Sequence, residues 1–150
     1  MQEKFYDPDK CMGFMTFTTS RMLAASLHKH MAALGLDLTA EQWGLLMRFW
    51  NRGDITQEEI TRIAGVDKST VSRALKGMER KGWIIRKLDP ADTRRKILSL
   101  TDKADALKQS SLRAVQITLA QALKGIDMEE CAVCLKVLGL IKTNLLDAAE

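Results

Sequence analysis

The chain has few of the residues that mark several large classes of protein. Its 150 residues include 3 Cys, 2 Pro and 2 His, which predicts neither a disulfide scaffold nor an ordinary zinc site. The most apolar stretch, residues 131–141, contains a lysine and is shorter than the roughly 20 residues that cross a bilayer. The N-terminus also lacks the layout of a signal peptide. We therefore expect a cytoplasmic protein that does not interact with membranes.

Sequence motifs for catalysis and metal binding are absent too. The only two histidines, His28 and His30, are two positions apart and point to different faces of any helix. No GxSxG elbow, HExxH pair or phosphate-binding glycine loop occurs. We expect no enzyme activity, no bound metal and no cofactor.

Positive charge is concentrated in one part of the chain. The formal net charge is +4, but residues 62–96 contain 11 basic and 4 acidic residues, a local charge of +7. The rest of the chain has 12 basic and 15 acidic residues, a charge of −3. This distribution is typical of a nucleic-acid-binding module on an acidic scaffold.

Start and stop signals predict a mainly helical chain. Two capping boxes begin at Thr39 and Thr56, and three further N-caps are plausible at Asp67, Thr101 and Asp127. Four glycines stand where helices are expected to end in the left-handed conformation: Gly35, Gly53, Gly82 and Gly125. The resulting helices cover residues 11–34, 40–52, 57–64, 68–81, 102–124 and 128–148.

Residues 57–81 have the layout of a helix-turn-helix, with Gly65 in the turn. In the second helix Val71, Leu75 and Met78 recur at helical spacing and are expected to face inward. The opposite face is small and polar near its N-terminus and basic further along, as a helix that enters the major groove requires. The same pattern would also suit an ordinary solvent-exposed helix face.

A hairpin is predicted directly after this helix. Two short β-branched runs, Trp83–Leu88 and Lys96–Leu100, flank a tip that is rich in Pro and Asp. Arg94 in the tip suits a narrow minor groove, because a guanidinium is flat and weakly hydrated. Asp92 either braces that arginine with a charge-assisted bond or acts only as a turn residue.

The last predicted helix is too apolar to be hidden on one side. Between Cys131 and Leu146, 11 of 16 residues are apolar and they point to more than one face. The first helix offers a matching surface that includes Phe14, Phe17 and Met22. Because symmetric dimers are the commonest oligomers, we expect both termini to pack together across a twofold axis. The alternative is an ordinary buried helix inside a monomer.

These residues resemble the winged-helix signature of the MarR (multiple antibiotic resistance regulator) family. The resemblance is carried by Asp92-x-Arg94 before Leu100-Thr101, and upstream by Ser69–Arg73, Gly82, Arg86 and Asp89-Pro90. It implies a mainly α fold with a small β-hairpin wing, in which residues 1–38 and 102–150 form a dimerisation region and residues 39–101 a winged helix-turn-helix domain. A homodimeric transcriptional repressor on a pseudo-palindromic double-stranded DNA operator would follow. The predicted DNA contacts are Ser69, Thr70, Ser72, Arg73, Lys76, Asp92, Arg94, Arg95 and Lys96.

Regulation by a small aromatic or lipophilic effector is a further implication of the resemblance, in a cleft between the dimerisation helices and the winged helix. Candidate lining residues are Phe17, Arg21, His28, Trp43 and Met47. The alternative is that Trp43 and Met47 pack in the core while Arg21 and His28 make surface or dimer contacts.

Two other functions stay open at this point. Cys11, at the start of the first helix, and Cys131 and Cys134, on the last, would suit a thiol-redox-sensing regulator of the same fold. A winged-helix module that binds an acidic partner protein instead of DNA is the other alternative.

Overall fold

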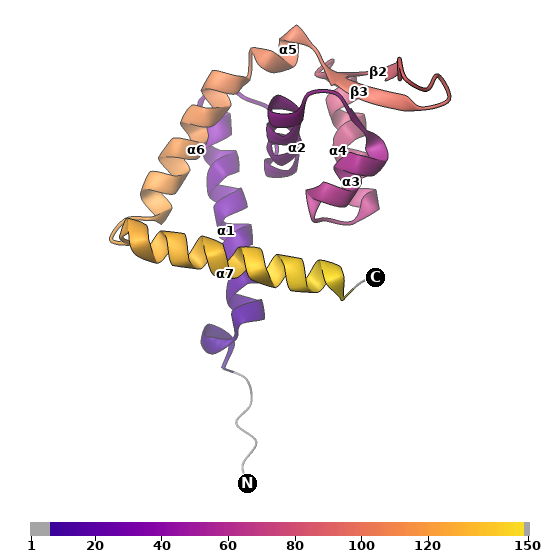
Figure 1. Ribbon diagram of the computed structural model, residues 1–150. Helices are drawn as coiled ribbons and strands as arrows, with labels where there is room; N and C mark the ends of the chain where they lie inside the picture. The colour runs from indigo at the N-terminus through magenta and orange to yellow at the C-terminus, as the bar shows by residue number, and fades with distance from the viewer. Residues whose placement is uncertain (1–6, 149–150) are drawn as a thin grey trace. The chain divides into compact units, whose positions relative to one another are not determined.

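The computed structural model describes residues 7–148, which form helices and one small antiparallel sheet (Figure 1). Two compact units result, Met1–Thr118 and Leu119–Glu150, and each is described by itself. This architecture confirms the predicted winged-helix fold class. In chain order the elements are η1 (Pro8–Lys10), α1 (Met12–Ala33), α2 (Ala40–Arg52), β1 (Ile55–Thr56), α3 (Gln57–Ala64), α4 (Lys68–Arg80), β2 (Ile84–Leu88), β3 (Lys96–Leu100), α5 (Asp102–Asp105), α6 (Lys108–Ala122) and α7 (Met128–Asp147).

The predicted helix starts are largely confirmed. Thr39, Thr56 and Asp127 each form a reciprocal capping box with the residue three positions on. Asp67 caps α4 with its carboxylate. Thr101 precedes α5 but makes no side-chain cap; its hydroxyl instead donates to the carbonyl of Gly82 at 2.6 Å, which joins the start of α5 to the start of the hairpin.

One expectation about the helices was wrong, and one strand was missed. The predicted helix over residues 102–124 is interrupted after Asp105, because the Leu107 N–H bonds to Ala104 in a tighter, three-residue turn before α6 begins. The short strand β1 was not predicted, since only its pairing with β3, Ile55 opposite Leu98, makes these two residues a strand.

The hydrophobic core of unit 1 lies between the helices and the inner face of the sheet. The strand order is β1-β3-β2, all antiparallel, with Ile84 opposite Leu100. Burying each of the large core side chains contributes about 1.5–3 kcal/mol. The largest fully buried ones include Phe49, Met31, Leu38, Leu46, Ile60, Leu75, Met78, Ile84 and Leu98.

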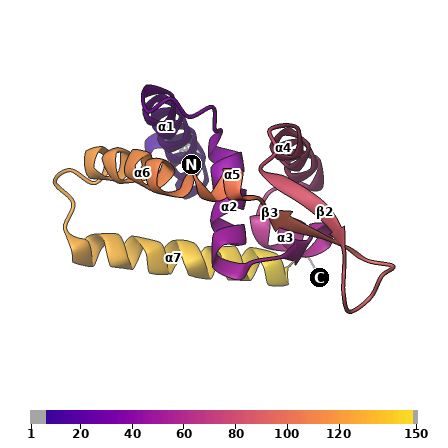
Figure 2. The same ribbon diagram turned by 90° about the horizontal axis from the view of Figure 1, so that it is seen from above.

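Within unit 1, α1 and the first part of α6 run side by side (Figures 1 and 2). They are joined by a bond of 2.9 Å between Nδ1 of His30 and Oγ1 of Thr118. The Thr118 hydroxyl also lies 2.9 Å from the Ala114 carbonyl one turn earlier in α6. α1 also exposes large apolar residues, among them Met12, Phe14, Met15, Phe17 and Met22.

Unit 2 is dominated by α7, a helix without a single buried residue. Its apolar side chains are distributed around the helix, as the sequence predicted. Exposed members include Val133, Leu135, Leu138, Leu140, Leu145 and Leu146. Among the described residues no helix combines the length and hydropathy needed to cross a membrane.

Candidate nucleic-acid interface

The helix-turn-helix is formed by α3 and α4, joined through Gly65. Gly65 has a φ of +72°, a left-handed conformation that glycine adopts without strain, so α3 ends there. Arg48 of α2 holds this turn by donating from Nε to the Ile63 carbonyl at 3.1 Å and from Nη2 to the Ala64 carbonyl at 3.3 Å. Burial, and then the nearby charge of Arg52, lower the pKa of Arg48. Sequence reasoning missed Arg48, whose partners lie 15 and 16 residues away.

The two faces of α4 divide as predicted. Val71, Leu75 and Met78 are at most 1% exposed and pack in the core. Gly77 also faces inward, and a Cβ there would lie 2.9 Å from Nε2 of Gln42, so α2 and α4 approach closely at this point. The outer face carries the exposed residues Ser69, Arg73, Lys76 and Arg80, with Ser72 half-buried among them.

The first turn of α4 is organised around the carboxylate of Asp67. Oδ1 of Asp67 accepts from the Thr70 amide at 2.9 Å and from the Ser69 hydroxyl at 2.5 Å, and Oδ2 accepts from the Thr70 hydroxyl at 2.6 Å. These bonds, led by that of the Ser69 hydroxyl, hold the pKa of Asp67 far below its ordinary value. Nη2 of Arg73 lies 3.4 Å from the Thr70 hydroxyl oxygen, at the limit of a hydrogen bond.

The predicted hairpin is β2 and β3, whose tip extends away from the helices of unit 1 (Figure 2). At the tip Nε of Arg94 donates to Oδ1 of Asp92 at 3.2 Å, and the Arg94 amide donates to the same oxygen at 3.1 Å. Asp92 therefore fulfils both interpretations, because it forms the turn and braces the arginine. The Arg94 side chain is 91% exposed, and its neighbours Arg95 and Lys96 are exposed as well.

Arg86 of β2 fastens the base of the hairpin to both helices of the helix-turn-helix. Its guanidinium makes a two-pronged contact with Glu79 of α4, from Nε at 2.7 Å and from Nη2 at 3.2 Å. Nη1 donates to Oε1 of Gln57, the first residue of α3, at 2.8 Å. The spacing of these residues in the sequence gave no signal for this contact. It links the wing to α3 and α4.

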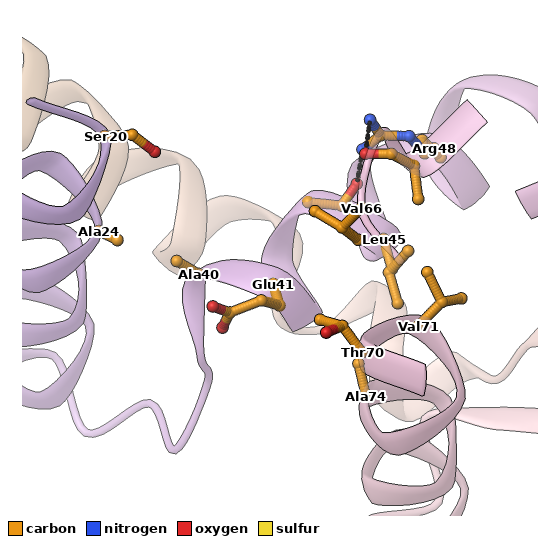
Figure 3. Close-up of a pocket in the computed structure, with 12 residues that line it drawn as sticks. Ser20, Ala24, Ala40, Glu41, Leu45, Arg48, Val66, Thr70, Val71 and Ala74 are labelled. Carbon is orange, nitrogen blue, oxygen red and sulfur yellow. Dashed lines mark hydrogen bonds between the residues drawn. The ribbon is translucent and has the colours of Figure 1, made fainter. Parts of the chain in front are cut away.

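A cleft of about 260 Å³ lies between α1, α2 and the start of α4 (Figure 3). Its lining is mostly apolar, with Arg48 as the one cation and Glu41 as the one carboxylate among the described residues. None of the five residues predicted for an effector site lines this cleft. Phe17, Arg21 and His28 are exposed on α1, where Arg21 stacks over the Phe17 ring, and Trp43 and Met47 are half-buried in α2.

The three cysteines are free thiols. Cys11 lies in unit 1 and is half-buried, whereas Cys131 and Cys134 lie in unit 2, half-buried and exposed respectively. Over residues 7–148 no three side chains of His, Cys, Asp or Glu form a group suited to a metal ion.

Comparison with known proteins relates this geometry to transcriptional regulators. The sequence model of the MarR family matches residues 38–96. The crystal structure of the transcriptional regulator PA3341 is 33% identical, with a TM-score of 0.76 over 91% of this chain and 99% of that one. A structure assigned to the MarR family, from Listeria monocytogenes and in complex with 26-mer DNA, is 29% identical with a TM-score of 0.79, over 93% and 91% of the two chains.

A curated relative points in the same direction. The uncharacterised HTH-type transcriptional regulator YdgJ of Bacillus subtilis is 27% identical over 101 residues. The match covers 67% of this chain but only 62% of the length of YdgJ.

Proposed function

The chain belongs to the MarR family of transcriptional regulators, and we propose that it acts as a homodimeric repressor that binds a pseudo-palindromic DNA operator and is released by a small ligand. In this proposal residues 39–101 bind DNA and residues 1–38 and 102–150 form the dimer. The polar face of α4 enters the major groove, and Arg94 of the wing enters the adjacent minor groove.

The main support for DNA binding is the fixed relation between α4 and the wing. Arg86 joins β2 to Glu79 at the end of α4, so the strand that leads to the basic tip is linked directly to the helix that carries the basic face. That the relative from Listeria monocytogenes forms a complex with 26-mer DNA supports DNA binding as the function.

The test is fluorescence anisotropy with labelled duplex from the region upstream of the gene, compared with a scrambled duplex. We expect a preference of about 10³-fold or more for the native duplex. Between 50 and 200 mM salt the affinity should fall by about 10³ to 10⁵ if 6 to 10 phosphates are contacted. Weak binding that is equal for both duplexes would favour the protein-interaction module instead.

Dimerisation is proposed from the apolar surfaces that each unit leaves uncovered. In unit 1 the exposed side of α1 carries Phe14 and Phe17, and in unit 2 α7 is apolar on several sides. Soluble monomers rarely expose so many contiguous apolar groups, so a second copy is the expected cover. Sedimentation should give twice the chain mass of 16.8 kDa. Leu138→Glu should shift it toward the monomer, while Thr143→Glu, the same change of charge on the opposite, polar face of the same helix, should not.

Ligand release is proposed for the cleft beside α4. Arg48 forms no ion pair among the described residues, and three of its five N–H groups bond to backbone carbonyls, which leaves two for a ligand. The volume and apolar walls suit a compound with one ring, and a carboxylate on it would pair with Arg48. Because Thr70 and Ala74 of α4 line the same cleft, an occupant would contact the proposed recognition helix directly.

Benzoate is a suitable first probe for this part of the proposal. We expect it to weaken operator binding of the wild-type protein and to have no effect on Ala24→Trp, which fills the cleft from the α1 side. Ala25→Trp, the neighbouring exposed position on the same helix, is the control and should respond like the wild type. If benzoate weakens operator binding of all three proteins equally, the cleft is not the ligand site.

A further inference from the structure

We propose that Asp67 determines which bases the start of α4 can read, by turning the hydroxyls of Ser69 and Thr70 into pure hydrogen-bond acceptors. The operator should then place an exocyclic amino group, N6 of adenine or N4 of cytosine, opposite Ser69 in each half-site. This inference rests on the proposed function, because it assumes that α4 lies in the major groove.

The first step is to locate the hydroxyl protons. A serine or threonine hydroxyl has one proton to donate and two lone pairs that accept. An ionised carboxylate can only accept, so the Ser69 and Thr70 hydroxyls must be the donors in their contacts with Asp67. Asp67 is ionised at neutral pH, since the same bonds lower its pKa.

The second step concerns what is left for a ligand. Both protons point back toward Asp67, and the contacts of 2.5 and 2.6 Å are as short as charge-assisted bonds become. Ser69 is exposed, so its two lone pairs face solvent with no proton among them. The Thr70 oxygen is half-buried and already lies near Arg73, so Ser69 is the principal reader.

The third step matches this surface to the major groove. There adenine offers N6–H₂ and cytosine offers N4–H₂ as donors, whereas guanine N7 and O6 and thymine O4 are acceptors. A hydroxyl with a free proton pairs with either kind, and for this reason serine is usually a poor discriminator. Ser72 is such a hydroxyl, because it makes no hydrogen bond among residues 7–148, and it lies one turn further along the same face.

The experiment begins by selecting a preferred duplex from a randomised library with the full-length wild-type protein. Every adenine and cytosine of one half-site is then replaced singly by purine or 2-pyrimidinone, which lack the exocyclic amino group. We expect one position at which this change weakens binding of the wild-type protein by about tenfold, roughly the contribution of one hydrogen bond. At that position the same change should leave the affinity of Ser69→Ala unaltered. Ser72→Ala is the matched control and should keep the full sensitivity at that position.

A second variant tests the role of Asp67 itself. Asp67→Asn keeps a good N-cap, but its amide can donate to a hydroxyl, which frees that hydroxyl's proton. At the same position we compare the affinity for a duplex with guanine or thymine with the affinity for the preferred duplex. We expect this ratio to be about fivefold or more higher for Asp67→Asn than for the wild type. Asp54→Asn, the same change of charge elsewhere, should leave the ratio unchanged.

Two outcomes would overturn the proposal while leaving DNA binding intact. Either Ser69→Ala changes the preference at a guanine or thymine instead, or it changes the preference at no base. If the library yields no preferred sequence at all, the proposed function itself fails, and this inference fails with it.

Discussion

Replacing Arg86 should detach the wing from the helix-turn-helix without removing either element. Arg86 makes two bonds to Glu79 and one to Gln57, and the side chains of Arg86 and Glu79 are 33% and 30% exposed. Exposed ion pairs contribute about 0.2–1 kcal/mol, and buried hydrogen bonds to charged groups about 1.5–3 kcal/mol. A two-pronged pair with this exposure lies between these limits, so we expect Arg86→Ala to lower the free energy of unfolding by about 1–2 kcal/mol.

The assays are thermal unfolding and operator binding. For a chain of this size such a loss corresponds to a fall in Tm of about 2–8 °C. Operator affinity should fall more than the lost charge explains, because Arg94 at the tip would no longer be held at a fixed distance from α4. Lys87→Ala is the matched control: it removes the same charge from the adjacent, exposed position of β2, where no side-chain bond is formed among the described residues.

The difference between the two variants isolates the positioning effect. We expect Arg86→Ala to bind the operator about tenfold more weakly than Lys87→Ala, a difference of about 1.4 kcal/mol. Equal Tm values and equal affinities for the two variants would refute the reasoning, and the wing would then be positioned by the strand pairing alone.

Three further outcomes are expected. Arg94→Ala should weaken operator binding by about tenfold or more while sedimentation still gives the same oligomer, and unchanged binding would remove the wing tip from the interface. Asp67 has a folded-state pKa below its ordinary value of 3.8, so its contribution to stability is present above that value and is lost as the pH falls below it. In urea unfolding, the stability of Asp67→Ala should therefore fall less on acidification than that of the wild type. Parallel plots of stability against pH for the two proteins would argue against the cap. Leu75→Ala, at a fully buried position of α4, should lower the free energy of unfolding by about 2–5 kcal/mol in the same assay, whereas a change under 1 kcal/mol would mean that the site collapses around the cavity.

The parts of the fold that sequence reasoning predicted best depend on contacts within a few residues. α2 and α3 begin and end where the sequence placed them, because a capping box at each start and a glycine at each end are local signals. The inward face of α4 was predicted from helical spacing alone, and burial of Val71, Leu75 and Met78 confirms it.

The parts that it missed depend on residues distant in the chain. The break after Asp105 coincides with a bond from the Trp50 indole to that carboxylate, across 55 residues. β1 is a strand only because β3 pairs with it, and Arg86 reaches Gln57 across 29 residues. Such partners leave no periodic pattern in the sequence.

The effector residues illustrate a different difficulty. Aromatic and basic side chains on α1 and α2 were selected by type, but the cleft is lined by small residues such as Ala24, Gly44 and Ala74. A cleft forms where neighbouring helices carry side chains too small to fill the space between them. Residue type therefore predicts what could bind a ligand, whereas the sizes of facing residues determine where there is room for one.

The four carboxylates within the basic 62–96 segment all accept hydrogen bonds. Asp67 caps α4, Glu79 binds Arg86, Asp89 accepts from the Ala91 amide at 2.8 Å, and Asp92 braces Arg94. Each acidic group is thus occupied by a donor of the same segment, and all four bonds lie on the elements that would face DNA. Most of the basic side chains, in contrast, stay exposed. Glu79 and Asp92 are paired with arginines, which offset their charges, whereas Asp67 and Asp89 accept only from hydroxyl and amide groups and keep theirs. The segment still carries a net charge of +7, which favours contact with phosphates.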